Sequence, residues 1–522
     1  MQRRLPVKRI ISLLLSFVLL LSCLSGCSSE KKPYVPTGNG LTWDEDYTGP
    51  AATRPHETES KPLTLAYYPD RSMNPILCTD YTNRTLFSLM YQSLFVVDWD
   101  YNVEPMLCKR FSVNPELTHY TFYIEENVTF SDGALLTATD VVETLKAAWQ
   151  SQYYKGRFLH VTSISLTPDN GISIQLETPC ENLPLLLDVP IIPSTQLADP
   201  MPAGTGPYYF ERNAMGTSLR RRTDWWCNAE MVVTAPTIAL LEAESITQLR
   251  DEFQFSDLSL VCTDPGSDRY ADYRCDYELW DSENGIFLYL AVCEDSTVFS
   301  DPEVRKALTY AIDRDMLVEK YYRGFARSAT LPASPQSPYY NQTLASRYTY
   351  DSSKFAQVIA DKELLGKSVT MLVNKDDSLR LRVAREIAGM LKEAGLEVKM
   401  SELSTSAYEE ALMYWRFDIY LGQTRLSANM DLSAFFHTTG ALSWGEVNDI
   451  NAYTLTLQAM ENHGNYYTLH QTIMENGLLC PVLFRSYAIY ATRGLVTGLT
   501  PSRDNIFYYS LGKNMEHALI RE

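Results

Sequence analysis

The chain has 522 residues, of which 45% are hydrophobic and 21% charged, and its 45 basic and 64 acidic residues give a formal net charge of −19. The normal apolar fraction excludes wholesale disorder. Ordinary counts of 26 Pro and 24 Gly exclude collagen-like and low-complexity chains. The acidic balance argues against a nucleic-acid partner, because phosphate binding needs clustered Lys and Arg. The length allows about two to four domains of roughly 150 residues each.

The first 27 residues predict export and membrane anchoring. Four basic residues up to Arg9 precede an apolar run over 10–21, which is too short for a membrane-spanning helix of roughly 20 residues. This pattern is typical of a secretory signal peptide, and Leu-Ser-Gly-Cys at 24–27 resembles the bacterial lipobox. We predict a lipoprotein signal peptide over 1–26 and lipidation of Cys27. The alternatives are an uncleaved anchor or a cleavage elsewhere that leaves Cys27 unused.

Residues 27–61 predict a lipid-anchored flexible tether, because small, polar and Pro residues dominate them. A flexible chain of this length spans about 30 Å. The mature chain keeps 41 basic and 64 acidic residues, a formal net charge of −23. Its eight remaining cysteines either pair or stay as buried thiols, since spacing alone assigns no bridge; they are Cys78, Cys108, Cys180, Cys227, Cys262, Cys275, Cys293 and Cys480.

Beyond the tether, alternating apolar residues predict a strand over 63–67, and an apolar stripe predicts a helix over 85–95. Thr137 and Asp140 predict the start of a helix, with Thr137 as its N-cap. Asp301-Pro302 predicts another, with an apolar stripe reaching Ile312. A β–α–β pattern over 365–422, with Gly395 ending its helix, predicts a mixed or parallel sheet covered by helices on both faces.

Motifs for catalysis and metal binding are missing from the sequence. There is no GxSxG or HExxH pattern, and Gly366-Lys367-Ser368 lacks the first glycine of a phosphate-binding loop, so we expect Lys367 in a solvated loop. His463 and His470 lie seven residues apart, roughly 10.5 Å on a helix, too far to share one metal ion. We expect surface or hydrogen-bonded histidines, no metal, no cofactor and no enzyme. Aromatic residues in polar settings, such as Trp225 and Trp444, suit a wet cleft, although packing on a strand face or at an interface is the commoner explanation for any one of them.

Ordered motifs along the chain resemble the family-5 extracellular solute-binding proteins of ABC importers, the oligopeptide-, dipeptide- and nickel-binding group. The matching segments are Asn74-Pro75, 91–95, 104–105, 120–122, 128–133, 136–141, 204–208, 301–308, 311–314 and Gly324. The resemblance covers about residues 62–512. It implies an α/β, bilobal, type II periplasmic-binding-protein-like fold with an extra small domain.

The resemblance also implies domain boundaries: lobe I from 62–95, 190–285 and 485–522, an extra domain over 96–189, and lobe II over 286–484. A ligand between the lobes would stabilise the closed state that an importer senses. The expected partners are a small solute or peptide, ABC permease subunits and the membrane through the lipid anchor, with the protein acting as a monomer outside the cytoplasm.

The ligand is where the sequence departs from the family. Its peptide binders usually carry Asp-Tyr-x-Asp-Pro, whose first Asp holds the peptide ammonium. Ala428 stands at that place and Asp431 at the second Asp, so either Asp431 substitutes or the ligand lacks an N-terminal amine. Arg425 follows a predicted strand, where it clasps a ligand carboxylate or forms a surface salt bridge. Candidate ligand contacts are Asn74, Tyr208, Trp225, Gln423, Arg425, Asp431 and Trp444. The alternatives in function are a ligand sensor coupled to a signalling membrane protein and a lipoprotein hydrolase.

Overall fold

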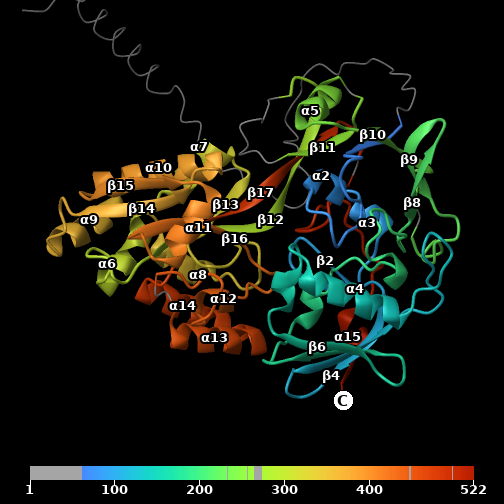
Figure 1. Cartoon of the computed structure of the whole chain (residues 1–522), viewed down its shortest axis with the longest axis horizontal. Helices are drawn as coiled ribbons and strands as arrows, with labels where there is room; N and C mark the ends of the chain where they lie inside the picture. The colour runs from blue at the N-terminus through green and yellow to red at the C-terminus, as the bar shows by residue number, and fades with distance from the viewer. Residues whose placement is uncertain are drawn as a thin grey trace, which may run out of the picture. The chain divides into compact units, whose positions relative to one another are not determined.

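The computed structural model describes residues 62–521 except 232, 256, 264–272, 446–447 and 497. The predicted signal peptide, Cys27 and the tether lie outside the described residues. Within the described part of the chain, no helix is both long and apolar enough to cross a membrane. Figure 1 shows mixed sheets with helices packed on them, as expected for an α/β fold.

A four-stranded sheet has the order β1-β10-β9-β8. Its strands are β1 (Thr64–Tyr67), β8 (Tyr208–Asn213), β9 (Gly216–Arg221) and β10 (Thr237–Glu242). Beside it lie α2 (Tyr81–Arg84), α3 (Phe87–Met90) and α5 (Ile246–Gln254). The predicted strand over 63–67 is confirmed as β1. The predicted helix over 85–95 is wrong: α3 is four residues long, all of them buried, and β2 begins at Phe95.

The seven-stranded sheet has the order β11-β17-β12-β16-β14-β15, with β13 pairing β17. Two long antiparallel strands, β12 (Tyr277–Val292) and β17 (Cys480–Thr492), run through its middle, side by side (Figure 1). The others are β11 (Leu260–Thr263), β13 (Ala326–Ser328), β14 (Ser368–Asn374), β15 (Glu397–Leu403) and β16 (Ile419–Arg425). β14 pairs in parallel with both β15 and β16, which confirms the predicted β–α–β pattern.

Helices pack on this sheet and around it. The helix joining β14 to β15 is α10 (Ser378–Glu393), and Gly395 follows it with φ +102°. The others are α6 (Pro302–Ala307), α7 (Arg314–Tyr322), α8 (Gln342–Ala345), α9 (Ser352–Asp361), α11 (Thr405–Met413), α12 (Ser433–Phe436), α13 (Ile450–Glu461) and α14 (Tyr466–Asn476). Asp301 caps α6 as predicted, but the α-helix stops at Ala307 and continues as a 3-10 turn to Ala311.

A five-stranded sheet has the order β18-β4-β5-β7-β6. It contains β4 (Cys108–Val113), β5 (His119–Ile124), β6 (Val161–Leu166), β7 (Ile172–Leu176) and β18 (Leu519–Arg521), which pairs in parallel with β4. Figure 1 shows α15 (Met515–Ala518) close to β4. A separate pair joins β2 (Phe95–Val97) to β3 (Val103–Pro105).

Helix α4 (Ala138–Gln150) packs on this five-stranded sheet, and its start follows the predicted cap. The Thr137 hydroxyl accepts a bond from the Asp140 amide, and the Asp140 carboxylate accepts one from the Thr137 amide at 2.9 Å. This reciprocal capping satisfies two N–H groups that have no partner within the helix.

One continuous hydrophobic cluster joins the four-stranded and five-stranded sheets, because residues such as Leu65, Phe122 and Ile489 belong to it together. Two further clusters fill the region around β14, β16 and α13. The predicted boundaries of lobe I, the extra domain and lobe II remain a proposal. Of the two alternatives left open for the cysteines, Cys78, Cys108, Cys180, Cys227 and Cys480 follow the second, since they are buried free thiols.

Candidate ligand-binding site

A cavity of 760 Å³ lies where four parts of the chain meet. Its walls come from residues 149–159 at the end of α4, from 424–442 at the end of β16 and around α12, and from Arg503 and Thr79. Apolar side chains such as Trp149, Phe158 and Phe435 cover part of it. Sites for small ligands have volumes of about 300–1,000 Å³ and mostly apolar walls with a few polar groups. This cavity therefore has the size and lining of a small-ligand site.

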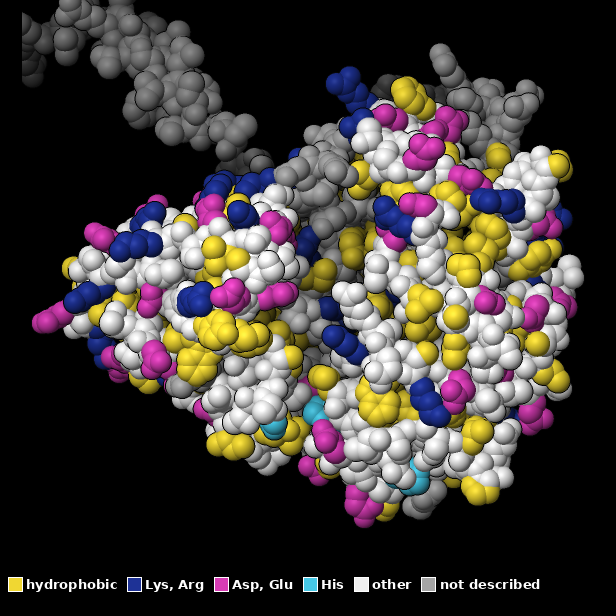
Figure 2. Space-filling view, viewed as in Figure 1, with side chains coloured by type: hydrophobic (Ala, Val, Ile, Leu, Met, Phe, Trp, Pro, Cys, Tyr) yellow, Lys and Arg dark blue, Asp and Glu magenta, His cyan; other side chains and the backbone are white. Residues whose placement is uncertain are grey.

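The charged residues in the cavity wall are mostly cations. Among the described residues that line the cavity, the charged ones are Lys155, Arg157, Arg425 and Arg503 and one carboxylate, that of Asp431. On the face shown in Figure 2, Lys and Arg side chains lie among acidic and apolar ones, and some lie in the hollow at its centre. The residues that line the cavity thus carry a net positive charge, whereas the whole chain has a formal net charge of −19.

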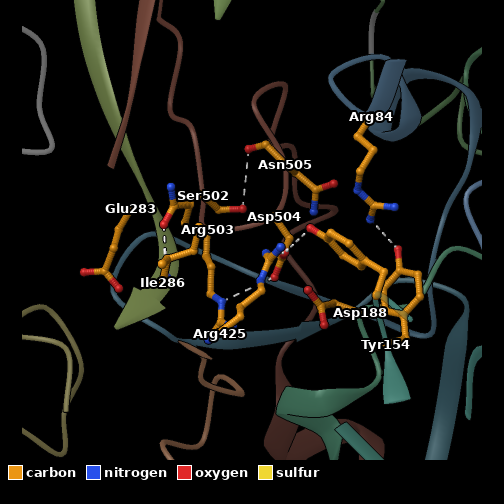
Figure 3. Close-up of polar contacts among 12 residues, drawn as sticks. Arg84, Tyr154, Asp188, Glu283, Ile286, Arg425, Ser502, Arg503, Asp504 and Asn505 are labelled. Atoms are coloured by element: carbon orange, nitrogen blue, oxygen red, sulfur yellow. Dashed lines mark hydrogen bonds and ion pairs between the residues drawn. The ribbon is translucent and has the colours of Figure 1, made fainter. Parts of the chain in front are cut away.

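The carboxylate of Asp504 contacts three arginines of this wall. Its carboxylate pairs with Arg425, lies 3.1 Å from an Nη of Arg157 and 3.6 Å from Nε of Arg503, and leaves only 9% of its own side chain exposed. Figure 3 shows Arg425 of β16 and Arg503 turned toward Asp504. Burial alone raises the pKa of a carboxyl. Here the positive charges, Arg425 first, outweigh burial and hold the pKa of Asp504 well below its usual range.

Aromatic rings support the same arginines. Arg425 lies over the ring of Tyr153, with Cζ 4.4 Å from the centroid, and Arg84 lies over the same ring at 3.4 Å. Arg84 also donates to the Tyr154 hydroxyl at 2.7 Å, a contact drawn in Figure 3. Arg157 also pairs with Asp188. Planar guanidinium groups stack well on aromatic faces, so these rings fix the positions of the cations.

Asp431, the acidic residue among those that line the cavity, is already paired. His160 Nε2 lies 2.9 Å from its carboxylate, and the Ser433 amide donates to it at 2.8 Å. Burial lowers the pKa of His160, but the hydrogen bond and charge of Asp431 outweigh it, and the pKa is raised overall. This pair connects the loop before β6 to the segment before α12. The carboxylate of Asp431 is therefore already hydrogen-bonded within the protein.

The long strands β12 and β17 run beside this site, and β12 comes close to it at Gly285. Their pairing is irregular between Glu283 and Phe287. Gly285 lies inside the irregularity with φ +70°, and a Cβ there would lie 2.6 Å from Cζ of Arg503. Only glycine suits both the conformation and the close approach. The bend in β12 therefore makes room for an arginine of the cavity wall.

Residues 102–445 match the bacterial extracellular solute-binding proteins, family 5. This chain belongs to that family. It is 24% identical over 404 residues to the oligopeptide-binding protein AppA of Bacillus subtilis, covering 70% of this chain and 74% of the relative. It is 21% identical over 359 residues to the glutathione-binding protein GsiB of Salmonella typhi, covering 64% and 67%.

Solved structures share the fold. A putative peptide-binding protein AppA from Clostridium difficile superposes with a TM-score of 0.71 at 16% identity, covering 85% of this chain and 98% of that one. AppA of Bacillus subtilis in complex with a nonapeptide gives 0.60 at 21%, covering 86% and 99%. NikA from Brucella suis in complex with Fe(III)-EDTA gives 0.68 at 18%, covering 85% and 98%. The predicted bilobal α/β fold of the solute-binding proteins is thereby confirmed.

In this family-5 protein, two of the seven predicted ligand contacts line the cavity, Arg425 and Asp431. Gln423 accepts a bond from Arg485 at 3.0 Å, and Trp444 packs against the hydrophobic cluster around α12 and α13. Three others are buried and bonded to backbone: Asn74 donates to the Leu197 and Asp199 carbonyls, Tyr208 to that of Ala235, and Trp225 to that of Thr205. These contacts give the three side chains a role in the scaffold.

Sequence reasoning missed most of the cluster around Asp504. Arg157, Arg503 and Asp504 stand in no recognisable motif, and 347 positions separate Arg157 from Asp504. The available signal was Tyr153-Tyr154 at the end of an amphipathic helix, followed at once by Lys155 and Arg157. The expectation for the histidines was wrong for His470, which is fully buried with neither ring nitrogen hydrogen-bonded among the described residues.

Within the described ranges, no group of three or more His, Cys, Asp or Glu side chains is arranged to hold a metal ion. Lys367 is exposed in a loop, as predicted.

Proposed function

We propose that this protein is a lipid-anchored receptor that binds a short peptide in the 760 Å³ cavity and delivers it to an ABC importer, without catalysing a reaction. The observation that carries the proposal is the cavity itself, built from four chain regions of a family-5 solute-binding protein. A solute that touches several of these regions favours the arrangement in which they are together, and a permease then recognises that arrangement.

Two relatives support a peptide as the solute. The curated relative AppA of Bacillus subtilis is named an oligopeptide-binding protein, and GsiB a glutathione-binding protein. The cavity has the size of small-ligand sites, which favours short peptides. We propose the same domain boundaries as above, a monomer, and anchoring through Cys27 on the outer face of the cell membrane.

The test uses the full-length protein, purified from its membrane in detergent. Native mass spectrometry is expected to show peptide masses that leave on gentle denaturation and return unmodified, and a pool of tri- and tetrapeptides is expected to raise Tm. Modified products would instead support the hydrolase. Finding neither retained peptides nor a rise in Tm would refute the peptide proposal.

Anchoring and delivery need separate measurements. Cys27→Ser is expected to move the protein from the membrane fraction to the soluble fraction and to abolish the lipid mass; unchanged fractionation would refute lipidation. Crosslinking in cells is expected to recover permease subunits. Recovery of a signalling membrane protein instead would support the sensor alternative.

A further inference from the structure

We propose that His160 and Asp431 form a proton-controlled latch beside the cavity, which holds firmly when His160 is protonated and loosens when His160 is neutral. The latch rests on the proposed function, because the 760 Å³ cavity is taken as the solute site. It adds a regulation to that site: the pH of the medium sets how firmly the cavity walls are held together around a solute.

The two partners of the latch stand in parts of the chain that pack into different cores. His160 comes directly before β6, and its neighbour Val161 belongs to the hydrophobic cluster that joins the four-stranded and five-stranded sheets. Asp431 comes just before α12, and its neighbour Met430 belongs to the cluster around α12 and α13. Leu159 and Asp431 both line the cavity. The bond between His160 and Asp431 therefore ties two parts of the cavity wall to each other.

The surroundings of the imidazole favour its protonated form. Nε2 of His160 lies 2.9 Å from an oxygen of Asp431, and the two side chains are only 14% and 4% exposed. Nδ1 has no hydrogen-bond partner among the described residues, but it lies 3.5 Å from a carboxylate oxygen of Glu177, directly after β7. A neutral ring with its proton on Nε2 has a lone pair on Nδ1, which the Glu177 carboxylate repels. A protonated ring attracts both carboxylates, most strongly where water is scarce.

The other ionisable groups around the pair keep one charge near neutral pH. Burial raises the pKa of the thiol and the two phenols nearby, which are those of Cys180, Tyr453 and Tyr466. Arg157 is held by two carboxylates of its own. Nδ1 of His463 lies 3.6 Å from Glu181, but burial lowers the pKa of His463, so this second histidine is neutral above about pH 6.5. His160 is thus the group whose charge changes there.

The direction of the pH effect follows from the proton that the latch takes up. Burial lowers the pKa of His160, but Asp431 and then Glu177 outweigh it and raise the pKa above its usual value of about 6.5. The latch is therefore at full strength below about pH 6.5 and weakens as the pH rises through the raised pKa. Against burial, His160 lowers the pKa of Asp431, so this carboxylate stays ionised down to about pH 4. A mildly acidic medium closes the latch, and an alkaline one loosens it.

The experiment measures solute affinity against pH on the full-length protein. The tetrapeptide that raises Tm most is titrated by calorimetry at about pH 6 and about pH 8.5, with the wild type and with His160→Gln, which keeps a hydrogen-bond donor but carries no charge. Dividing the Kd of the variant by that of the wild type at each pH cancels the titration of the peptide itself. We expect this ratio to be about 5- to 10-fold at the lower pH and to fall toward 1 at the higher pH.

Two further variants test the residues. Asp431→Asn removes the other charge; because Asp431 also lines the cavity, the readout is its pH profile, which should be flatter than that of the wild type. His119→Gln is the matched control, since His119 is exposed in β5 of the same sheet and its Nε2 contacts the neutral hydroxyl of Ser173. It is expected to follow the wild type at both pH values.

A second readout needs no solute. Hydrogen exchange of the solute-free protein reports how firmly the backbone around 158–161 and 430–433 is held. These amides should exchange more slowly in the wild type than in His160→Gln at about pH 6, and the difference should shrink at about pH 8.5. Comparing the two proteins at the same pH cancels the intrinsic pH dependence of exchange.

The outcomes separate the latch from the proposed function. If the peptide binds but the Kd ratio and the exchange difference are the same at both pH values, the latch is wrong while the peptide receptor stands. If no peptide binds but the exchange difference shrinks with pH as expected, the peptide proposal is wrong and the latch stands. If both measurements fail, both are wrong. Should His160→Gln not fold, an Asp431→Asn protein with the wild-type pH profile would overturn the latch.

Discussion

Replacing Asp504 by Asn tests the arginine cluster directly. The substitution keeps the shape of the side chain but removes the charge that Arg425, Arg157 and Arg503 share. Removing one partner of a buried ion pair costs about 3–5 kcal/mol. We take the low end, about 3 kcal/mol, because 26% of the Arg425 side chain is exposed to screening solvent. The entropy of unfolding for a chain of this length is roughly 1 kcal/mol/K, so Tm should fall by about 3 °C.

The effect of Asp504 should depend on pH. The pKa of Asp504 is depressed in the folded state, so its ionisation stabilises the fold fully above the unfolded value of about 3.9 and progressively less as pH falls below it. The difference in Tm between wild type and Asp504→Asn is therefore largest near neutral pH and shrinks below about pH 4. Scanning calorimetry at several pH values measures it, with Asp361→Asn as an exposed control.

An Asp504→Asn protein with the Tm of the Asp361→Asn control, or with a deficit that does not shrink at acid pH, would refute the reasoning about the cluster.

Three further substitutions test other parts of the structure. Thr137→Ala removes half of the capping box with Asp140 and should cost about 1 kcal/mol in urea unfolding; an unchanged midpoint would contradict the cap. Gly285→Ala meets both a positive φ and the Arg503 guanidinium, so it should lower Tm and weaken solute binding together, whereas a loss of Tm alone would separate the bend from the site. His470→Leu should raise the free energy of unfolding by about 1–3 kcal/mol, because the buried ring has no hydrogen bond to any described residue. Burial lowers the pKa of His470 to about 3, so the wild type loses stability as pH falls from about 6.5 toward 3, and a Leu variant with the same acid sensitivity would refute this assignment.

The fold was predictable where local signals and the final packing agree. The β–α–β unit around α10 and the Thr137 cap follow from short-range patterns that the tertiary structure keeps. The helix over 85–95 failed because its apolar residues are buried on every side rather than along one stripe. Periodicity cannot separate a buried turn from a helix when the whole segment lies inside a core.

The candidate site was predictable only at Arg425, which ends strand β16, and at Asp431, which stands at a position of a family motif. Arg425 is placed for both roles considered for it, because it forms a salt bridge with Asp504 and also lines the cavity. The pairing of His160 with Asp431 spans 271 positions, and that of Arg157 with Asp504 spans 347. Contacts at such separations leave no periodic or spacing signal in one sequence.

The pairing of β18 with β4 has a consequence for synthesis and quality control. β18 follows every other described strand, yet it forms the outer strand of a sheet whose other members end by Leu176. That sheet cannot be completed until the ribosome has made nearly all of the described chain. A product cut short before Leu519 would display the unpaired rim of β4, which can recruit a strand from another molecule. Whether the edge of β4 is paired therefore distinguishes chains that contain β18 from chains that lack it.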